Sequence, residues 1–240
     1  TLNKWKIMFW NANSLRQRIK KGDFFTLLDE HRPEILFIFE TMTSFARINT
    51  YHDFQRELEK RGYQFHFESV STAKPRKWGY AGVMVISKHD PYAVHTGVEN
   101  DTLDEEGRHI ELYFPNIVIT GTYIPNSGSV GKLQFLDKKI TYIKALETRL
   151  LKIQQENPNK LLVWGADTNV VVRDEDIYNG ASNPCNSLHP SCHKAEREAF
   201  GSMISRTGLQ NEIHNHNTKE QQIFTFFFKK EFIPKNMGMH

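Results

Sequence analysis

The chain has 240 residues, of which 39% are hydrophobic and 25% are charged, and its formal net charge is only +3. This composition is ordinary for one large globular domain or two small ones, and it excludes a collagen-like, low-complexity or strongly polybasic protein. There is no apolar run of membrane-spanning length, so we expect no membrane partner. The two cysteines, Cys185 and Cys192, are too few for a disulfide scaffold. They suit a reducing, intracellular compartment: nuclear in a eukaryote, cytoplasmic in a bacterium.

The N-terminal half of the chain alternates apolar strand-like runs with amphipathic stretches. Residues 34–40 (EILFIFE) are typical of a buried strand, because five apolar residues lie between two carboxylates. Glycines mark the predicted ends or breaks of helices. Strands are predicted at 4–12, 34–40, 64–69 and 80–88, and helices at 14–31, with a break at Gly22, and at 51–63, ended by Gly62.

The C-terminal half is predicted to contain two neighbouring strands joined by a turn at Pro115–Asn116. Its other elements are a long amphipathic helix, a further strand, a polar insertion and a shorter helix ended by Gly208. Strands are predicted at 108–114, 117–125, 159–167 and 223–228, helices at 132–155 and 194–208, and a loop at 171–192. Paired strands with few helices between them predict an α/β fold in which two mixed β-sheets pack face to face, with helices outside.

Polar side chains follow several of the predicted buried strands. If these strand ends converge, they form an oxygen-rich site of the kind that binds Mg²⁺, which suits phosphoryl chemistry better than zinc chemistry. For any single Asn or Asp a turn role is the alternative, whereas Glu40 follows five apolar residues and is harder to explain in that way. The candidate residues are Asn11, Asn13, Glu40, Asn126, Asp167 and Asn169.

Two weaker signals have competing interpretations. The basic clusters at 16–21 and 74–77 suit phosphate contacts, although a solvated surface explains either one alone. Cys185, His189, Cys192 and His193 lie within nine residues and suggest a zinc knuckle. Adjacent Cys192 and His193 rarely both bind one metal, so we favour a polar insertion with scattered thiols.

Seven short motifs, in order, resemble those of the exonuclease III-like AP endonucleases, within the endonuclease/exonuclease/phosphatase superfamily. They are FWNANSLR, LFIFETMTS, GYAGVMVISK, DEEGRHIEL, TYIPNSG, GADTNV and EREAF. The resemblance implies a four-layered α/β-sandwich and a monomeric enzyme that uses Mg²⁺ or Mn²⁺. It implies cleavage 5′ to an abasic site in double-stranded DNA, with trimming of blocked 3′ ends. The alternatives are a retrotransposon-type endonuclease and a catalytically impaired homologue that binds DNA or a partner.

The resemblance also implies roles for individual residues. Glu40 is expected to bind the metal, with Asn11 beside it. Tyr123 and Asn126 are expected to bind the scissile phosphate, Asp167 to position or deprotonate the attacking water, and Asn169 to steady the phosphate. The residues expected to contact DNA are Tyr80, Arg108, Asn13 and Arg16, with Phe226 and Met239 lining the pocket for the base-less sugar.

The sequence departs from the family pattern in three places. The Gly-Asp-x-Asn motif has Ala166 in place of its glycine, and Met42 stands where a basic residue is usual. The family continues beyond the NMGMH motif to an Asp and a Ser-Asp-His segment, whereas this chain ends at His240. We therefore expect a single domain, 1–240, that is shortened at its C-terminus and has little endonuclease activity alone.

Overall fold

The computed structural model describes residues 4–72, 79–178, 187–212, 215 and 225. Two compact units make up the chain. The first comprises Thr1–Ile124 with Lys152–Thr168, and the second comprises Pro125–Leu151 with Asn169–His240. Among the helices of these described segments, none has the length and apolar character needed to cross a membrane.

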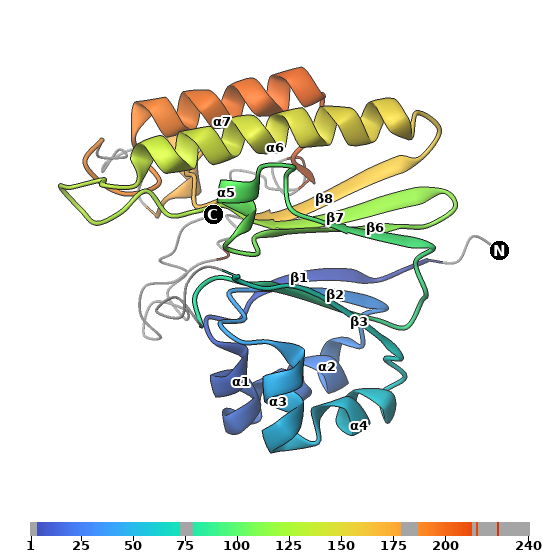
Figure 1. The fold of residues 1–240 in the computed structure, drawn as a ribbon. Helices are drawn as coiled ribbons and strands as arrows, with labels where there is room; N and C mark the ends of the chain where they lie inside the picture. The colour runs from blue at the N-terminus through green and yellow to red at the C-terminus, as the bar shows by residue number, and fades with distance from the viewer. Residues whose placement is uncertain (1–3, 73–78, 179–186, 213–214, 216–224, 226–240) are drawn as a thin grey trace. The chain divides into compact units, whose positions relative to one another are not determined.

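The first unit contains two mixed four-stranded sheets (Figure 1). One sheet has the order β1-β2-β4-β3, in which only β1 and β2 are parallel. Its strands are β1 (Ile7–Asn11), β2 (Ile35–Phe39), β3 (Phe65–Ser69) and β4 (Val83–Ser87). The other has the order β5-β6-β7-β8, in which only β7 and β8 are parallel. Its strands are β5 (Ala93–Thr96), β6 (His109–Tyr113), β7 (Ile117–Tyr123) and β8 (Leu161–Asp167).

The two sheets pack face to face through a buried apolar layer. Phe37 and Val85 of the first sheet share one core cluster with Ile110 and Ile119 of the second. Each of these four side chains is completely shielded from solvent. Since successive residues of a strand point to opposite faces, the remaining apolar residues of β2 are available to a second core.

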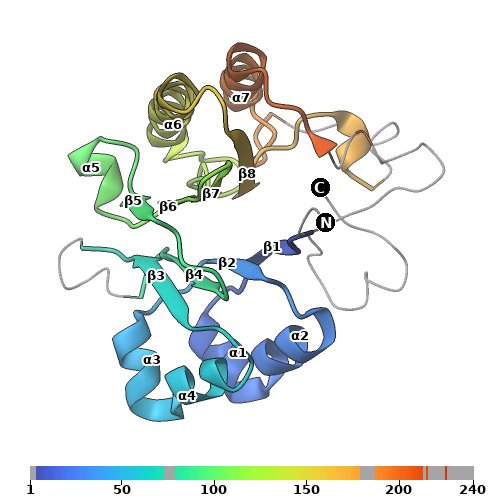
Figure 2. The same cartoon turned by 90° about the vertical axis from the view of Figure 1, so that its right-hand side faces the viewer.

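That second core lies between the first sheet and four helices on its outer face (Figure 2). Leu36 and Ile38 of β2 pack there against Leu15, Phe24 and Phe54 from the helices. Because β2 is buried on both faces, its sequence is a continuous apolar run rather than an alternating one. The helices are α1 (Leu15–Lys21), α2 (Asp23–His31), α3 (Phe45–His52) and α4 (Phe54–Glu59), and the short α5 (Asp101–Asp104) precedes β6.

The second unit is built on two helices, α6 (Leu136–Glu156), whose last turn belongs to the first unit, and α7 (Lys194–Thr207). A short 3₁₀-helix, η2 (Asp174–Asp176), precedes α7. The ion pairs Lys139–Glu196 and Glu147–Arg206 join α6 to α7. Lys139 precedes Glu147 in α6, and Glu196 precedes Arg206 in α7. The two helices therefore lie side by side and run in the same direction.

The predicted fold class, α/β with two mixed sheets, is confirmed, but several element boundaries were wrong. Gly22, at φ 81°, separates α1 from α2 as expected. The helix predicted at 51–63 instead begins at Phe45 and is divided at Asp53, which adopts a left-handed conformation. Strand β5, helix α5 and η2 were not predicted. The strand predicted at 223–228 lies outside the described residues, except for Thr225.

Candidate active site

Three side chains from the ends of three strands meet in the first unit. Asn11 ends β1, Asp167 ends β8, and Glu40 follows β2 directly. The Nδ2 of Asn11 donates to Glu40 Oε1 at 2.7 Å and to Asp167 Oδ2 at 2.6 Å. The backbone N–H of Asn13 donates to Asn11 Oδ1 at 2.9 Å, which fixes the orientation of the amide. One asparagine therefore holds two carboxylates together.

The local backbone explains why Glu40 reaches this point. Asn11 pairs with Phe39 in the parallel β1–β2 register, so the two strands end at the same edge of the sheet. Glu40 then adopts a left-handed conformation with φ 49°, which is uncommon for a residue with a side chain. Hydrogen bonds from Ala12 N to Phe39 O and from Ser14 N to Glu40 O, both 2.9 Å, hold this turn in place.

Tyr123 ends β7, where it pairs with Asp167 of β8, and it contributes a buried phenol to the same cluster. Burial raises the pKa of the phenol, the negative charge of Glu40 raises it further, and Arg108 opposes the change. Tyr123 consequently stays protonated at neutral pH and acts as a hydrogen-bond donor.

Arg108 contacts both Tyr80 and Tyr123, and it is only 1% exposed. Its Nε donates to Glu106 Oε2 at 2.8 Å, Nη1 to the Tyr123 carbonyl at 3.2 Å and Nη2 to the Tyr80 hydroxyl at 3.2 Å. Its guanidinium also lies 4.6 Å from the centre of the Tyr123 ring. The predicted direct contact of Arg108 with DNA stays a prediction, and this burial favours a positioning role for Arg108 instead.

The donor atoms of this cluster suit a hard divalent cation. Glu40 and Asp167 bring two carboxylates to one amide, so their negative charges are close together. Across the described segments, no group of three or more His, Cys, Asp or Glu side chains assembles as a metal site. Mg²⁺ needs only one or two protein carboxylates, because waters and substrate oxygens complete its coordination. Glu40 is the residue that would hold it, with Asn11 and the carboxylate of Asp167 beside it.

The other predicted site residues divide into four groups. Asn13 and Arg16 are exposed, so both are accessible to a polyanion. Asn126 and Asn169 belong to the second unit; Asn126 Oδ1 accepts from the N–H of Gly128 at 2.8 Å, as in a turn. Tyr80 is 45% exposed, so it is accessible to a partner. The remaining two, Phe226 and Met239, lie outside the described residues.

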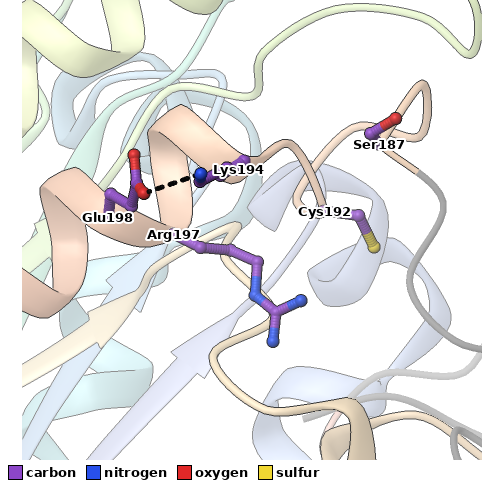
Figure 3. A pocket seen from close by; sticks show the side chains of 5 residues that line it. All are labelled: Ser187, Cys192, Lys194, Arg197 and Glu198. Carbon is purple, nitrogen blue, oxygen red and sulfur yellow. Dashed lines mark ion pairs between the residues drawn. The ribbon is translucent and has the colours of Figure 1, made fainter.

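A pocket of about 390 Å³ lies beside the start of α7, near the residues considered above for a zinc knuckle (Figure 3). Its cations are already paired, Lys194 with Glu198 and Arg197 with Asp174 at 3.1 Å. Cys192 is disulfide-bonded, so the predicted free thiol is wrong for this residue, and it has no thiolate to offer zinc. Cys185 lies outside the described residues.

The buried phenols predict how stability changes at alkaline pH. Burial raises the pKa of Tyr63 as well as that of Tyr123, so each folded-state phenol keeps its proton above pH about 10, where the unfolded chain releases it. The free energy of unfolding should therefore fall as pH rises above about 10. Urea unfolding of Tyr63→Phe and Tyr123→Phe should show a smaller fall between about pH 8 and about pH 10.5 than wild type does. Tyr92→Phe, at an exposed tyrosine, should change the fall little. An equal fall in wild type and in both buried-site variants would contradict the raised pKa of these two phenols.

Comparisons with known proteins agree with this geometry. A model described as the Endonuclease/Exonuclease/phosphatase family matches residues 8–228. The chain is 30% identical over 233 residues to an exodeoxyribonuclease of Bacillus subtilis, covering 97% of this chain and 84% of that protein. It is 27% identical over 226 residues to a DNA-(apurinic or apyrimidinic site) endonuclease of Dictyostelium discoideum, covering 94% of this chain and 57% of that protein.

A solved structure supports the fold independently. The AP endonuclease from Archaeoglobus fulgidus matches with a TM-score of 0.79 at 23% sequence identity. The match covers 99% of this chain and 84% of that one. The α/β arrangement of two mixed sheets is thus shared with a known nuclease structure.

Proposed function

Because the chain belongs to the Endonuclease/Exonuclease/phosphatase family, we propose that it is a DNA-repair nuclease that hydrolyses the phosphodiester 5′ to an abasic site. The observation that carries this proposal is the convergence of Glu40 and Asp167 on the amide of Asn11. The relatives, an exodeoxyribonuclease and an apurinic-site endonuclease, support DNA as the substrate, and we propose that this DNA is double-stranded. We also propose that the enzyme trims blocked 3′ ends. We propose that the enzyme acts as a monomer.

Each residue of the cluster has a chemical task in this proposal. A bound Mg²⁺ or Mn²⁺ would stabilise charge on the phosphate oxygens. Asp167 accepts a hydrogen bond from the attacking water and takes its proton as a general base. Tyr123, kept protonated by burial, donates a hydrogen bond to a phosphate oxygen when substrate is present. Asn11 keeps the carboxylates of Glu40 and Asp167 at a fixed separation.

Removal of the cation should abolish cleavage. The assay uses a duplex with one abasic site and a matched intact duplex, each with Mg²⁺ or with EDTA. We expect cleavage of the abasic strand with Mg²⁺, none with EDTA, and recovery on adding Mn²⁺, because the site offers only oxygen ligands. Cleavage that persists in EDTA would contradict the proposed metal dependence.

Two alternatives give different results in this assay. A retrotransposon-type endonuclease would cut the intact duplex as readily as the abasic one. A catalytically impaired homologue would bind DNA with a strong salt dependence and cut neither duplex. The paired carboxylates at Asn11 favour an active enzyme, because a binding protein has no need to hold two negative charges beside bound phosphate.

A further inference from the structure

Lys139 of the second unit is a fully buried cation whose contacts join three segments of the chain. Its Nζ donates to Glu196 Oε2 at 2.6 Å and to the backbone carbonyl of Asn169. Neither Lys139 nor Glu196 is exposed to solvent. The other carboxylate oxygen of Glu196 accepts from the backbone N–H of His193 at 2.9 Å, which caps the start of α7. Lys139 therefore connects α6, α7 and the segment that begins at Asn169.

Asn169 is a residue whose conformation needs such support. Its φ is 49°, in the left-handed region that residues with a side chain seldom adopt. Such conformations persist when surrounding contacts over-determine them, and they gather at functional sites. The neighbours Val170 and Val171 are buried, and the N–H of Val171 donates to the carbonyl of Ser191 at 2.8 Å. Lys139 supplies the contact on the other side of this segment, at Asn169 itself.

We propose that Lys139 is a positioning residue for catalysis, because its buried ammonium group holds the backbone of Asn169 and so aims the Asn169 amide at the phosphate. This inference rests on the proposed nuclease function, in which Asn169 steadies the phosphate. Lys139 itself does not reach the substrate, since its side chain is 0% exposed. It acts through Asn169, two residues after Asp167 in the chain.

A purely structural role for the Lys139–Glu196 pair is the competing explanation, and the two explanations can be separated. Removing one partner of a buried ion pair leaves an uncompensated charge, so Lys139→Met alone is destabilising under either explanation. Replacing both partners by apolar residues of similar volume is often neutral for stability. The double variant Lys139→Met/Glu196→Leu should therefore remain folded while the carbonyl of Asn169 loses its ammonium partner.

The pair Glu147–Arg206 provides a matched control. It joins the same two helices through a contact of 2.8 Å, and it does not include Asn169. The double variant Glu147→Gln/Arg206→Gln removes this cross-helix pair, which is the more exposed of the two. A change that merely loosens α6 against α7 should affect both double variants alike.

The experiment measures kcat and KM on an abasic duplex, together with the urea unfolding midpoint of each protein. We expect Lys139→Met/Glu196→Leu to lower kcat about 10–100-fold with KM within about twofold, because misplacing a group that acts in the transition state affects turnover rather than binding. The Glu147→Gln/Arg206→Gln control should keep the wild-type kcat. Wild-type kcat in the Lys139 double variant, or an equal loss in both double variants, would overturn the inference.

Hydrogen exchange at the amide of Val171 gives a readout that is independent of activity. Loss of the Lys139 contact should accelerate exchange there, and the control variant should not. If wild-type protein cleaves no DNA, the proposed function fails while this measurement still decides whether Lys139 holds the segment. Unchanged exchange in the Lys139 double variant would overturn the positioning role.

Discussion

Asp167→Asn is expected to reduce the rate of abasic-site cleavage by about 10²–10⁴-fold, the usual contribution of a general base. The variant keeps an oxygen that can accept from Asn11 Nδ2, now 2.6 Å from Asp167, but it loses the negative charge and the basicity. Its stability should be unchanged or higher, because one of two neighbouring negative charges is removed. Single-turnover kinetics at saturating enzyme measures the effect, so that DNA affinity does not influence the observed rate.

Asp29→Asn is the matched control for this prediction. Asp29 is an exposed carboxylate that pairs with Arg61 at 2.7 Å on the helical side of the first unit. Exposed pairs of this kind contribute about 0–1 kcal/mol to stability, and this one has no role in the proposed chemistry. Cleavage by Asp29→Asn should match wild type. A rate for Asp167→Asn within about threefold of wild type would be incompatible with general-base catalysis by this residue.

Gly165→Ala and Gly121→Ala are each expected to lower the free energy of unfolding by about 1–3 kcal/mol, as overpacked core substitutions do. The two glycines face each other in the β7–β8 register, and a side chain of the facing sheet occupies the space that a Cβ would need at either one. A Cβ at Gly165 would lie 2.2 Å from the Phe9 ring, and one at Gly121 would lie 2.3 Å from the Phe37 ring. These rings stack on each other with centroids 5.0 Å apart, so neither can move without disturbing the other.

Urea unfolding tests this packing argument. The double variant Phe9→Leu/Gly165→Ala should be less destabilised than the sum of its single changes, because the smaller side chain makes room for the methyl group. Gly201→Ala is the control: this exposed glycine in α7 has open space around its Cβ position. It should gain about 0.5–1 kcal/mol from the higher helix propensity of alanine. A Gly165→Ala protein as stable as wild type would mean that the sheets are not packed as described.

The position of the Glu40 carboxylate at the end of a buried strand could be predicted from the sequence, because two physical signals coincide there. A run of five apolar residues marks a buried strand, and a charged residue directly after it must lie at the sheet edge. Parallel strands end at the same edge, so Asn11 meets Glu40 once β1 and β2 pair. The same reasoning holds for Tyr123 and Asp167, which end the parallel pair β7 and β8.

Other features of the site could not be inferred from residue types. The DNA contact expected of Arg108 came from the family resemblance, and nothing local predicts its burial, which depends on the counter-charge of Glu106 two residues earlier. Nothing local marks Asn11 as the donor to both carboxylates, since its second acceptor is 156 residues away. The four-residue strand β5 escaped prediction because it is largely exposed and lacks a continuous apolar run.

We propose that Glu40, with Asp167 beside it, forms the divalent-cation site of a nuclease. A crystal of the protein soaked in Mn²⁺ tests this most directly, because the anomalous signal of manganese locates the ion independently of the protein atoms. We expect a peak in contact with the Glu40 carboxylate and beside Asp167, and its loss in Glu40→Gln crystals. A bound manganese elsewhere with these two carboxylates free, or an undiminished peak in Glu40→Gln, would contradict it.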